Sequence, residues 1–388
     1  MIFSLDFFVT VAFVLIQWRV NVLLLRLARK RTSGPSRTAA STLIVALDLT
    51  LVAGFVASYS EVVSALGLAA APAQALGAAT LVYFAIAAAA ISVHAAWSLI
   101  SRQFLGAVDP RRRKVLQTVS NSLIAVPAAV LGYGAFIERF DFHVKEVDVP
   151  VPGLPADLEG LRILQLSDIH LSAFLSERDL ERVIDSANET RAHIAVMTGD
   201  LISTTGDPLD ACIRQIARLK SDTGIWGCLG NHERYAKVED YTAQAAARLG
   251  VRFLRSQTEP LRFGNSVVNL AGIDYQPWSG RHNYLSGKRG LVRPGAVNVL
   301  LSHNPDVFPA AAHQGYNLLL AGHTHGGQIS VEILDQAINP ARFFTPYIYG
   351  LYRTPTASAY VTRGIGTIGL PVRIGAPPEI SLLRLRKA

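Results

Sequence analysis

Five short motifs in this sequence carry residues that bind metal ions, and each directly follows a short apolar run. The candidate ligands are two aspartates, one asparagine and four histidines: Asp168, His170, Asp200, Asn231, His303, His323 and His325. This mixture of oxygen and imidazole ligands favours Mn, Fe or Zn over Ca, which prefers oxygen ligands alone. The residue types therefore predict a site for divalent metal ions.

The number of candidates indicates how many ions are bound. A single catalytic ion needs three or four protein ligands, so seven candidates suit two ions that share a carboxylate. Two ions about 3.5–4 Å apart can hold a phosphate and generate a hydroxide for in-line attack. The predicted chemistry is therefore hydrolysis of a phosphoester.

The apolar runs that precede these motifs are predicted strands. The first three cover residues 161–167, 194–197 and 225–229, and predicted helices at 176–190, 207–220 and 238–249 follow them in turn. Strands that alternate with helices indicate an α/β fold with a parallel sheet, and ligands bind at the carboxyl ends of such strands. We therefore expect Asp168, Asp200 and Asn231 to converge.

Further strands are expected closer together along the chain. A half-exposed strand is predicted at 143–149, and later ones follow at 251–255, 260–263, 266–273, 297–302, 317–321, 327–333, 358–363 and 379–385. Short strands with few helices between them predict a second sheet, mostly antiparallel.

The order of the motifs resembles that of the calcineurin-like metallophosphoesterase superfamily. The shared pattern is DxH, GD, GNHE, a single His and GHTH, which here begin at Asp168, Gly199, Gly230, His303 and Gly322. The C-terminal motifs GHTHGGQ, GLY, TRGIG and GLPVR resemble the membrane-associated bacterial branch related to the YkuE and YaeI phosphodiesterases. The resemblance covers about residues 144–386, and it implies a four-layer α/β/β/α sandwich.

The resemblance also implies a role for each residue. Asp200 bridges two ions; Asp168, His170 and His325 complete one site, and Asn231, His303 and His323 the other. His232 is implied to act as general acid without binding metal, and Glu233 either orients it or is a solvated loop carboxylate. Arg363 and Arg373 either hold a substrate phosphate or are rim charges.

The N-terminal part has a different composition. The 388 residues are 50% hydrophobic and only 17% charged, and the charged share is low for a soluble protein. Four apolar segments, at about 3–27, 39–59, 74–100 and 115–137, have the length of membrane spans. The sequence thus predicts an all-α transmembrane bundle over 1–140 and a phosphoesterase domain over 141–388.

The charges in this part predict its orientation. The connections at 26–37 and 102–114 are rich in Lys and Arg, whereas the connection at 60–73 has none. Basic loops stay cytoplasmic, so the catalytic domain is expected outside the inner membrane of a bacterial cell. The excess of positive charge, +8 overall, is therefore interpreted as a topology signal, and no nucleic acid is expected as a partner. The two cysteines, Cys212 and Cys228, are predicted to be buried thiols.

The leading hypothesis is a membrane-anchored phosphoesterase acting on a phosphorylated, lipid-linked substrate, with membrane lipids as its other partners. One alternative is a membrane sensor or scaffold with a non-catalytic phosphate-binding domain. A second is a nucleotide-lipid pyrophosphate hydrolase facing the cytoplasm, which the basic loops disfavour.

Overall fold

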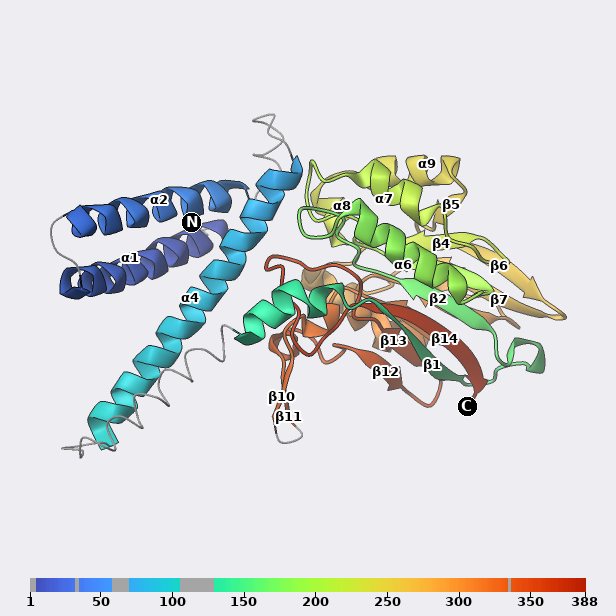
Figure 1. Cartoon of the computed structure of the whole chain (residues 1–388). Coiled ribbons are helices and arrows are strands. Elements are labelled where there is room, and N and C mark those ends of the chain that lie inside the picture. Colours follow the sequence, from blue (N-terminus) through green and yellow to red (C-terminus); the bar gives the residue numbers. More distant parts are fainter. Residues whose placement is uncertain (1–4, 32–34, 58–69, 105–128, 334–335) are drawn as a thin grey trace. The chain divides into compact units, whose positions relative to one another are not determined.

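The computed structural model describes residues 5–31, 35–57, 70–104, 129–333 and 336–388 (Figure 1). The chain divides into two compact units, Met1–Phe136 and Ile137–Ala388. We refer to them as the helical unit and the catalytic unit and describe each by itself.

The helical unit contains the long helices α1 (Leu5–Arg31), α2 (Pro35–Ala57) and α4 (Ala70–Phe104). Within the described residues, the stretch Thr38–Ala57 is long and apolar enough to cross a membrane, and a shorter apolar stretch, Ala79–Val93, lies in α4. Most of the fourth predicted span lies outside the described residues, although 129–136 are helical. The expected bundle of four spans therefore stays a prediction.

The first sheet of the catalytic unit has six strands in the order β1-β14-β2-β3-β4-β5. They are β1 (His143–Val151), β14 (Glu379–Lys387), β2 (Arg162–Leu166), β3 (Ile194–Thr198), β4 (Ile225–Cys228) and β5 (Val251–Phe253). The run β2 to β5 is parallel, as the alternation of strands and helices predicts. The C-terminal strand β14 is inserted between β1 and β2, parallel to β1 and antiparallel to β2.

The second sheet also has six strands, in the order β12-β13-β9-β8-β7-β6. They are β12 (Gly350–Arg353), β13 (Ser358–Val361), β9 (Leu318–Ala321), β8 (Val297–Leu301), β7 (Ser266–Gly272) and β6 (Gln257–Phe263). Only the two edge pairs are antiparallel, while β7, β8, β9 and β13 run parallel. The prediction of a mostly antiparallel sheet was wrong, because the sequence spacing does not reveal which strands become neighbours.

The two sheets pack face to face through a shared apolar core. Side chains alternate along a strand, so Val299 and Leu301 of β8 lie in this inner core, whereas Leu300 lies on the outer face. The inner core joins β2, β3 and β4 to β7, β8 and β9. Among its apolar side chains lies Gln165, which is fully buried and donates to Thr198 Oγ1 and to the carbonyl of Ala321, thus joining both sheets.

Helices cover the outer faces, which gives four layers (Figure 1). The first sheet is covered by α6 (Glu177–Glu189), α7 (Leu209–Ile216) and α9 (Glu239–Arg248), and the second by α10 (Phe308–Gln314). Ser176 caps α6 through a capping box with Asp179, as expected for a helix that starts there. The cysteines are free and buried, as predicted.

The sequence did not predict several short elements. They are α8 (Asn231–Tyr235), the helix α10, the strand β12 and the strand β11 (Gln336–Ile338), which pairs with β10 (Val331–Ile333) inside the predicted strand 327–333. Each is shorter than the window over which hydrophobic periodicity is read, so none produces a pattern of its own.

Candidate metal centre

The five motifs lie at strand ends of both sheets, not of one sheet. Asp168 and His170 follow β2, Asp200 follows β3, and Asn231 opens α8 directly after β4. From the second sheet, β8 leads to His303 and β9 to His323 and His325. Because these strands are parallel within each sheet, their carboxyl ends share an edge, and the candidate ligands meet there.

The backbone at these positions is unusual. Among the described residues, ten non-glycine residues have a positive φ, and five of them are candidate ligands: Asp168, His170, Asp200, His323 and His325. Such a conformation is unfavourable for most residues and concentrates at functional sites. Gly199, with φ +93°, precedes Asp200, and a Cβ there would lie 2.6 Å from the Gly230 nitrogen. Glycine is therefore required where the two motifs touch.

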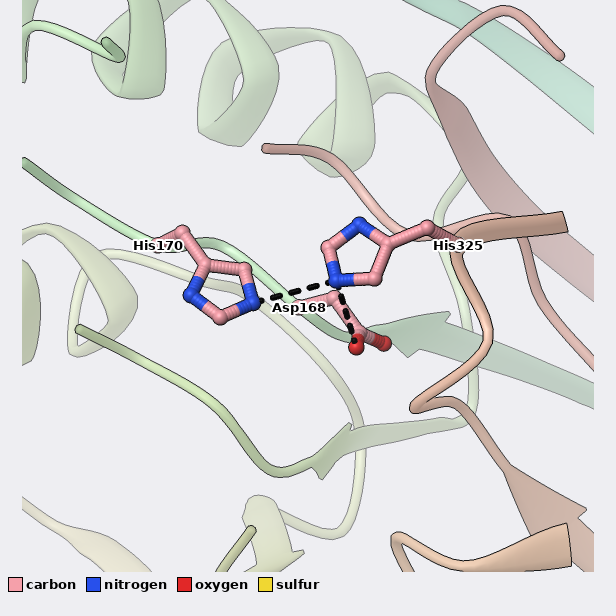
Figure 2. Close-up of side chains that lie close together, drawn as sticks. All are labelled: Asp168, His170 and His325. Atoms are coloured by element: carbon pink, nitrogen blue, oxygen red, sulfur yellow. Dashed lines mark hydrogen bonds and ion pairs between the residues drawn. The ribbon is translucent and has the colours of Figure 1, made fainter. Parts of the chain in front are cut away.

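One group of ligands comprises Asp168, His170 and His325 (Figure 2). The Nε2 atoms of His170 and His325 are 3.1 Å apart, and His325 Nε2 is 3.3 Å from Asp168 Oδ1. All three side chains are buried.

A second group comprises Asp200, His303 and His323. Asp200 Oδ2 lies 2.9 Å from His303 Nε2, and His303 Nε2 lies 3.1 Å from His323 Nδ1. The same carboxylate oxygen is 3.6 Å from His170 Nε2. Asp200 thus lies between the two groups.

The donor atoms in this cluster fit a bound cation. His303 Nδ1 donates to the carbonyl of Thr198 at 2.6 Å, which directs Nε2 at Asp200 and His323, where it can carry either a proton or a metal ion. The side-chain oxygen of Asn231 is buried without a hydrogen-bond partner. Lone pairs that face each other at about 3 Å repel unless a proton or a metal ion lies between them. The predicted ligands thus lie together in the structure, and their role in binding metal stays a prediction.

Burial and neighbouring charges shift the histidine pKa values apart. Burial lowers the pKa of His323 to about 4, and the pKa values of His170 and His325 lie well below the usual range for the same reason. Burial opposes protonation of His303 too, but the carboxylates of Asp200 and Asp168 outweigh it and raise its pKa to about 10. At neutral pH three imidazoles are therefore neutral, the form that binds metal.

Comparison with known proteins agrees with this geometry. The family model described as calcineurin-like phosphoesterase matches residues 161–327. The metallophosphoesterase YkuE of Bacillus subtilis is 30% identical over 282 residues, which cover 71% of this chain and 97% of YkuE. The chain belongs to the calcineurin-like metallophosphoesterase family. The predicted family and the prediction of a metal-dependent phosphoesterase are thus confirmed.

Two further relatives resemble this metallophosphoesterase. A zebrafish (Danio rerio) protein described as a transmembrane protein with metallophosphoesterase domain is 30% identical, covering 71% of this chain and 63% of its own length. The metallophosphoesterase Cj0846 of Campylobacter jejuni is 28% identical, covering 75% of this chain and 76% of its own.

In this metallophosphoesterase, His232 adjoins the cluster and forms a third group of possible ligands with His170 and Asp200. Its ring centre is 4.8 Å from that of His170, and its Nδ1 is hydrogen-bonded to the carbonyl of Ser203. Its backbone N–H donates to Asp200 Oδ1 at 2.9 Å. With Nδ1–H held by a carbonyl, Nε2 is the nitrogen that remains free to exchange a proton.

Glu233 has neither of the roles left open by the sequence. It is fully buried and accepts the backbone N–H groups of Asp200, Leu201 and Gly230 at 3.1, 2.6 and 2.7 Å. Ser203, and not Glu233, is the residue that orients His232. Glu233 instead ties the loop after β3 to the start of α8 and so fixes Asp200 relative to Asn231.

The two arginines predicted to bind substrate lie in different surroundings. Arg373 is fully buried, and its guanidinium donates to backbone carbonyls that include those of Gly366, Ala376 and Gly364. Arg373 could reach a substrate only if the backbone segment that holds these carbonyls unfolded. The prediction that Arg373 binds substrate or lies at the rim was therefore wrong. Arg363 is half-buried and lies against Tyr349, in the wall of a cavity.

A cavity of about 310 Å³ lies beside His323. We call it the apolar pocket, and it is lined by Trp278, Asn304, Pro305, Asp306, His323, Thr324, Ala341, Phe344 and Thr345. Tyr275 is buried with its ring centre 5.5 Å from that of His323. His282 is exposed, and it belongs to none of the metal-binding groups among the described residues.

Ser203, Thr198 and Tyr275 were not predicted as residues of the site. The first two act on the site through backbone carbonyls, which every residue possesses. No side-chain motif identifies such partners, so only the folded chain reveals them.

Proposed function

We propose that this protein is a membrane-anchored di-metal phosphoesterase that hydrolyses a phosphomonoester, phosphodiester or pyrophosphate, with a lipid-linked molecule as its substrate. The observation that carries the proposal is the buried cluster in which Asp200 lies between two sets of facing acceptor atoms. Such a cluster is unfavourable without cations and suits two of them.

We assign one ion to each of these two sets of side chains. Asp168, His170 and His325 would hold one ion, Asn231, His303 and His323 the other, and Asp200 would bridge them. Two divalent ions, of Mn, Fe or Zn, would neutralise phosphoryl charge and lower the pKa of a water molecule.

His232 is the proposed general acid. The Ser203 carbonyl holds Nδ1–H, so Nε2 would carry the proton for the leaving oxygen. The bond from the His232 backbone to Asp200 fixes the distance between this imidazole and the proposed bridge.

The apolar pocket supports a substrate with an organic, lipid-like group. It lies directly beside His323, and Trp278 and Phe344 in its wall are 48% and 67% exposed. Aromatic side chains that are open to solvent beside a reaction centre can hold an apolar group of the substrate.

The proposed location is the outer face of the bacterial inner membrane, with several spans in residues 1–140. The basic connections at 26–37 and 102–114 support this orientation because such loops stay cytoplasmic. An alkaline phosphatase fusion after Ala388 should be active, and a bright green fluorescent protein fusion there would contradict the orientation and favour a nucleotide-lipid hydrolase.

The test of the activity uses the full chain purified in detergent. We expect about two divalent ions per chain and metal-dependent hydrolysis of bis(p-nitrophenyl) phosphate. Two bound ions without turnover of any phosphoester would contradict the proposal in favour of a phosphate-binding sensor. A chain that binds no metal would exclude both functions.

A further inference from the structure

A second cavity of about 740 Å³ lies in the catalytic unit, and we call it the basic pocket. Its lining consists of Gly326, Ser330, Asn339, Arg342, Thr345, Pro346, Ile348, Tyr349, Tyr352, Arg363 and Gly375. Two arginines and no carboxylate contribute to this wall. The composition favours an anionic ligand.

The basic pocket adjoins the metal centre. Two residues after Arg363, the N–H of Ile365 donates to the Ser167 carbonyl at 3.1 Å, and the next N–H, that of Gly366, donates to the Asp168 carbonyl at 2.7 Å. Gly326 directly follows His325, and a Cβ on it would lie 2.7 Å from Cγ of Arg363. The segment after Arg363 is thus fixed to the backbone at Asp168, and the aliphatic part of the Arg363 side chain lies against the residue that follows His325. Asp168 and His325 both belong to the first group of candidate ligands.

Arg363 has no carboxylate in direct contact within the described residues, although the charge of Glu138 acts on it without forming an ion pair. Its guanidinium carbon lies 3.9 Å from the centre of the Tyr349 ring, and it forms no ion pair within the described part of the chain. Its Nε is buried without a hydrogen-bond partner. An arginine in this state retains its capacity for a bidentate bond to a phosphate.

A second cation acts on the same ring. Lys145 donates a hydrogen bond to the Tyr349 hydroxyl, and its Nζ lies 4.5 Å from the ring centre. Burial and the neighbouring carboxylate of Glu379 raise the pKa of Tyr349. Glu379 is itself fully buried and accepts hydrogen bonds from Tyr360 and Ser381. Two cations on one ring repel each other, and an anion in the basic pocket would reduce that repulsion.

We propose that the basic pocket binds a second phosphate group of the substrate while the metal centre holds the phosphoryl group that is cleaved. The inference rests on the proposed function and narrows its substrates to compounds with two phosphate groups. Thr345 lines both cavities, so an apolar part of the same molecule can occupy the apolar pocket. Arg363 and Arg342 are the residues that select for the second phosphate.

The test compares two small probes by titration calorimetry on the full chain with buffered free Mn²⁺. Methylphosphonate carries one phosphonate group and methylenediphosphonate carries two. We expect the second probe to bind about tenfold more tightly to the wild type, which corresponds to about 1.4 kcal/mol. Arg363→Gln and Arg342→Gln should each reduce this preference at least about threefold, whereas Arg363→Lys should retain part of it.

The control is Arg353→Gln, because Arg353 is exposed on β12 and does not line the pocket. It should leave the ratio of the two dissociation constants unchanged. Arg342 is exposed, so its variant remains informative even if Arg363→Gln fails to fold. A wild-type ratio near one, or a ratio that neither glutamine variant changes, would overturn the inference. Because binding is measured without turnover, failure of the phosphoesterase assay is a separate outcome.

Discussion

A half-buried polar cluster in the described part of the helical unit can be compared with the metal centre of the catalytic unit. In the helical unit, Gln17 and Asn21 of α1 donate side-chain hydrogen bonds to Asp48 of α2 at 2.7–3.1 Å. Tyr83 of α4 donates to Gln17 Oε1 at 3.0 Å. In the metal centre of the catalytic unit, by contrast, Nε2 of His170 faces Nε2 of His325, and the Asn231 oxygen has no partner.

The two clusters differ in whether the protein alone can satisfy their hydrogen-bond acceptors. Every contact in the helical cluster joins a donor to an acceptor, so the cluster is satisfied by the protein alone. In the metal centre acceptors outnumber donors, so a cation from solution is needed. Polar burial by itself therefore does not identify a metal site, whereas the balance of donors and acceptors does.

The strongest test of this comparison exchanges one aspartate for asparagine in each cluster. Asp200→Asn should remove the bridging carboxylate, lower the metal content and reduce kcat/KM by about 10³-fold or more, which is about 4 kcal/mol. The measurements are metal analysis and phosphodiester hydrolysis. Asp48→Asn is the matched control and should leave both unchanged. Two bound metals and normal activity in Asp200→Asn would remove the bridge assignment.

A smaller loss is expected when the proton donor is removed and the metal ligands are kept. His232→Ala should retain metal and slow hydrolysis by about 10²–10⁴-fold, the usual contribution of a general acid. The loss should be greatest for alkyl esters, whose leaving groups need a proton, and smallest for nitrophenyl esters. Equal losses for both esters, or a loss of metal, would contradict the assignment.

Replacing Arg373 measures what a buried charge contributes when its hydrogen bonds are made to backbone carbonyls. Burial lowers its pKa to about 10, so it stays charged at neutral pH while its guanidinium binds backbone carbonyls. Arg373→Met should lower the free energy of unfolding by about 3–5 kcal/mol because these buried carbonyls lose their donors. Denaturant unfolding measures this change. Arg353→Met, at an exposed site, should change stability by less than about 0.5 kcal/mol.

The smallest effect is expected in the helical cluster. Asp48→Ala removes the acceptor shared by Gln17 and Asn21, and at the proposed membrane location interhelical hydrogen bonds contribute about 0.6 kcal/mol on average. Unfolding in mixed micelles should therefore shift only slightly, with unchanged metal content. A loss of bound metal in this variant would show that the two clusters are coupled.

The sequence by itself determined which residues are available for the metal centre. Asp168, Asp200 and Asn231 each follow an apolar strand, and parallel strands bring their carboxyl ends together. The alternating strands and helices likewise determined the parallel run from β2 to β5. These features depend on local order along the chain, so they can be predicted without contacts.

Only the tertiary structure decided the features that depend on distant contacts. The parallel pairing of β13 with β9 made the second sheet largely parallel, and the insertion of β14 between β1 and β2 joined the two ends of the catalytic unit. Arg373 became a buried structural residue, whereas Arg363, ten positions earlier, was left facing a cavity. Residue type gives both arginines the same charge, and their burial and partners depend on which backbone folds around them.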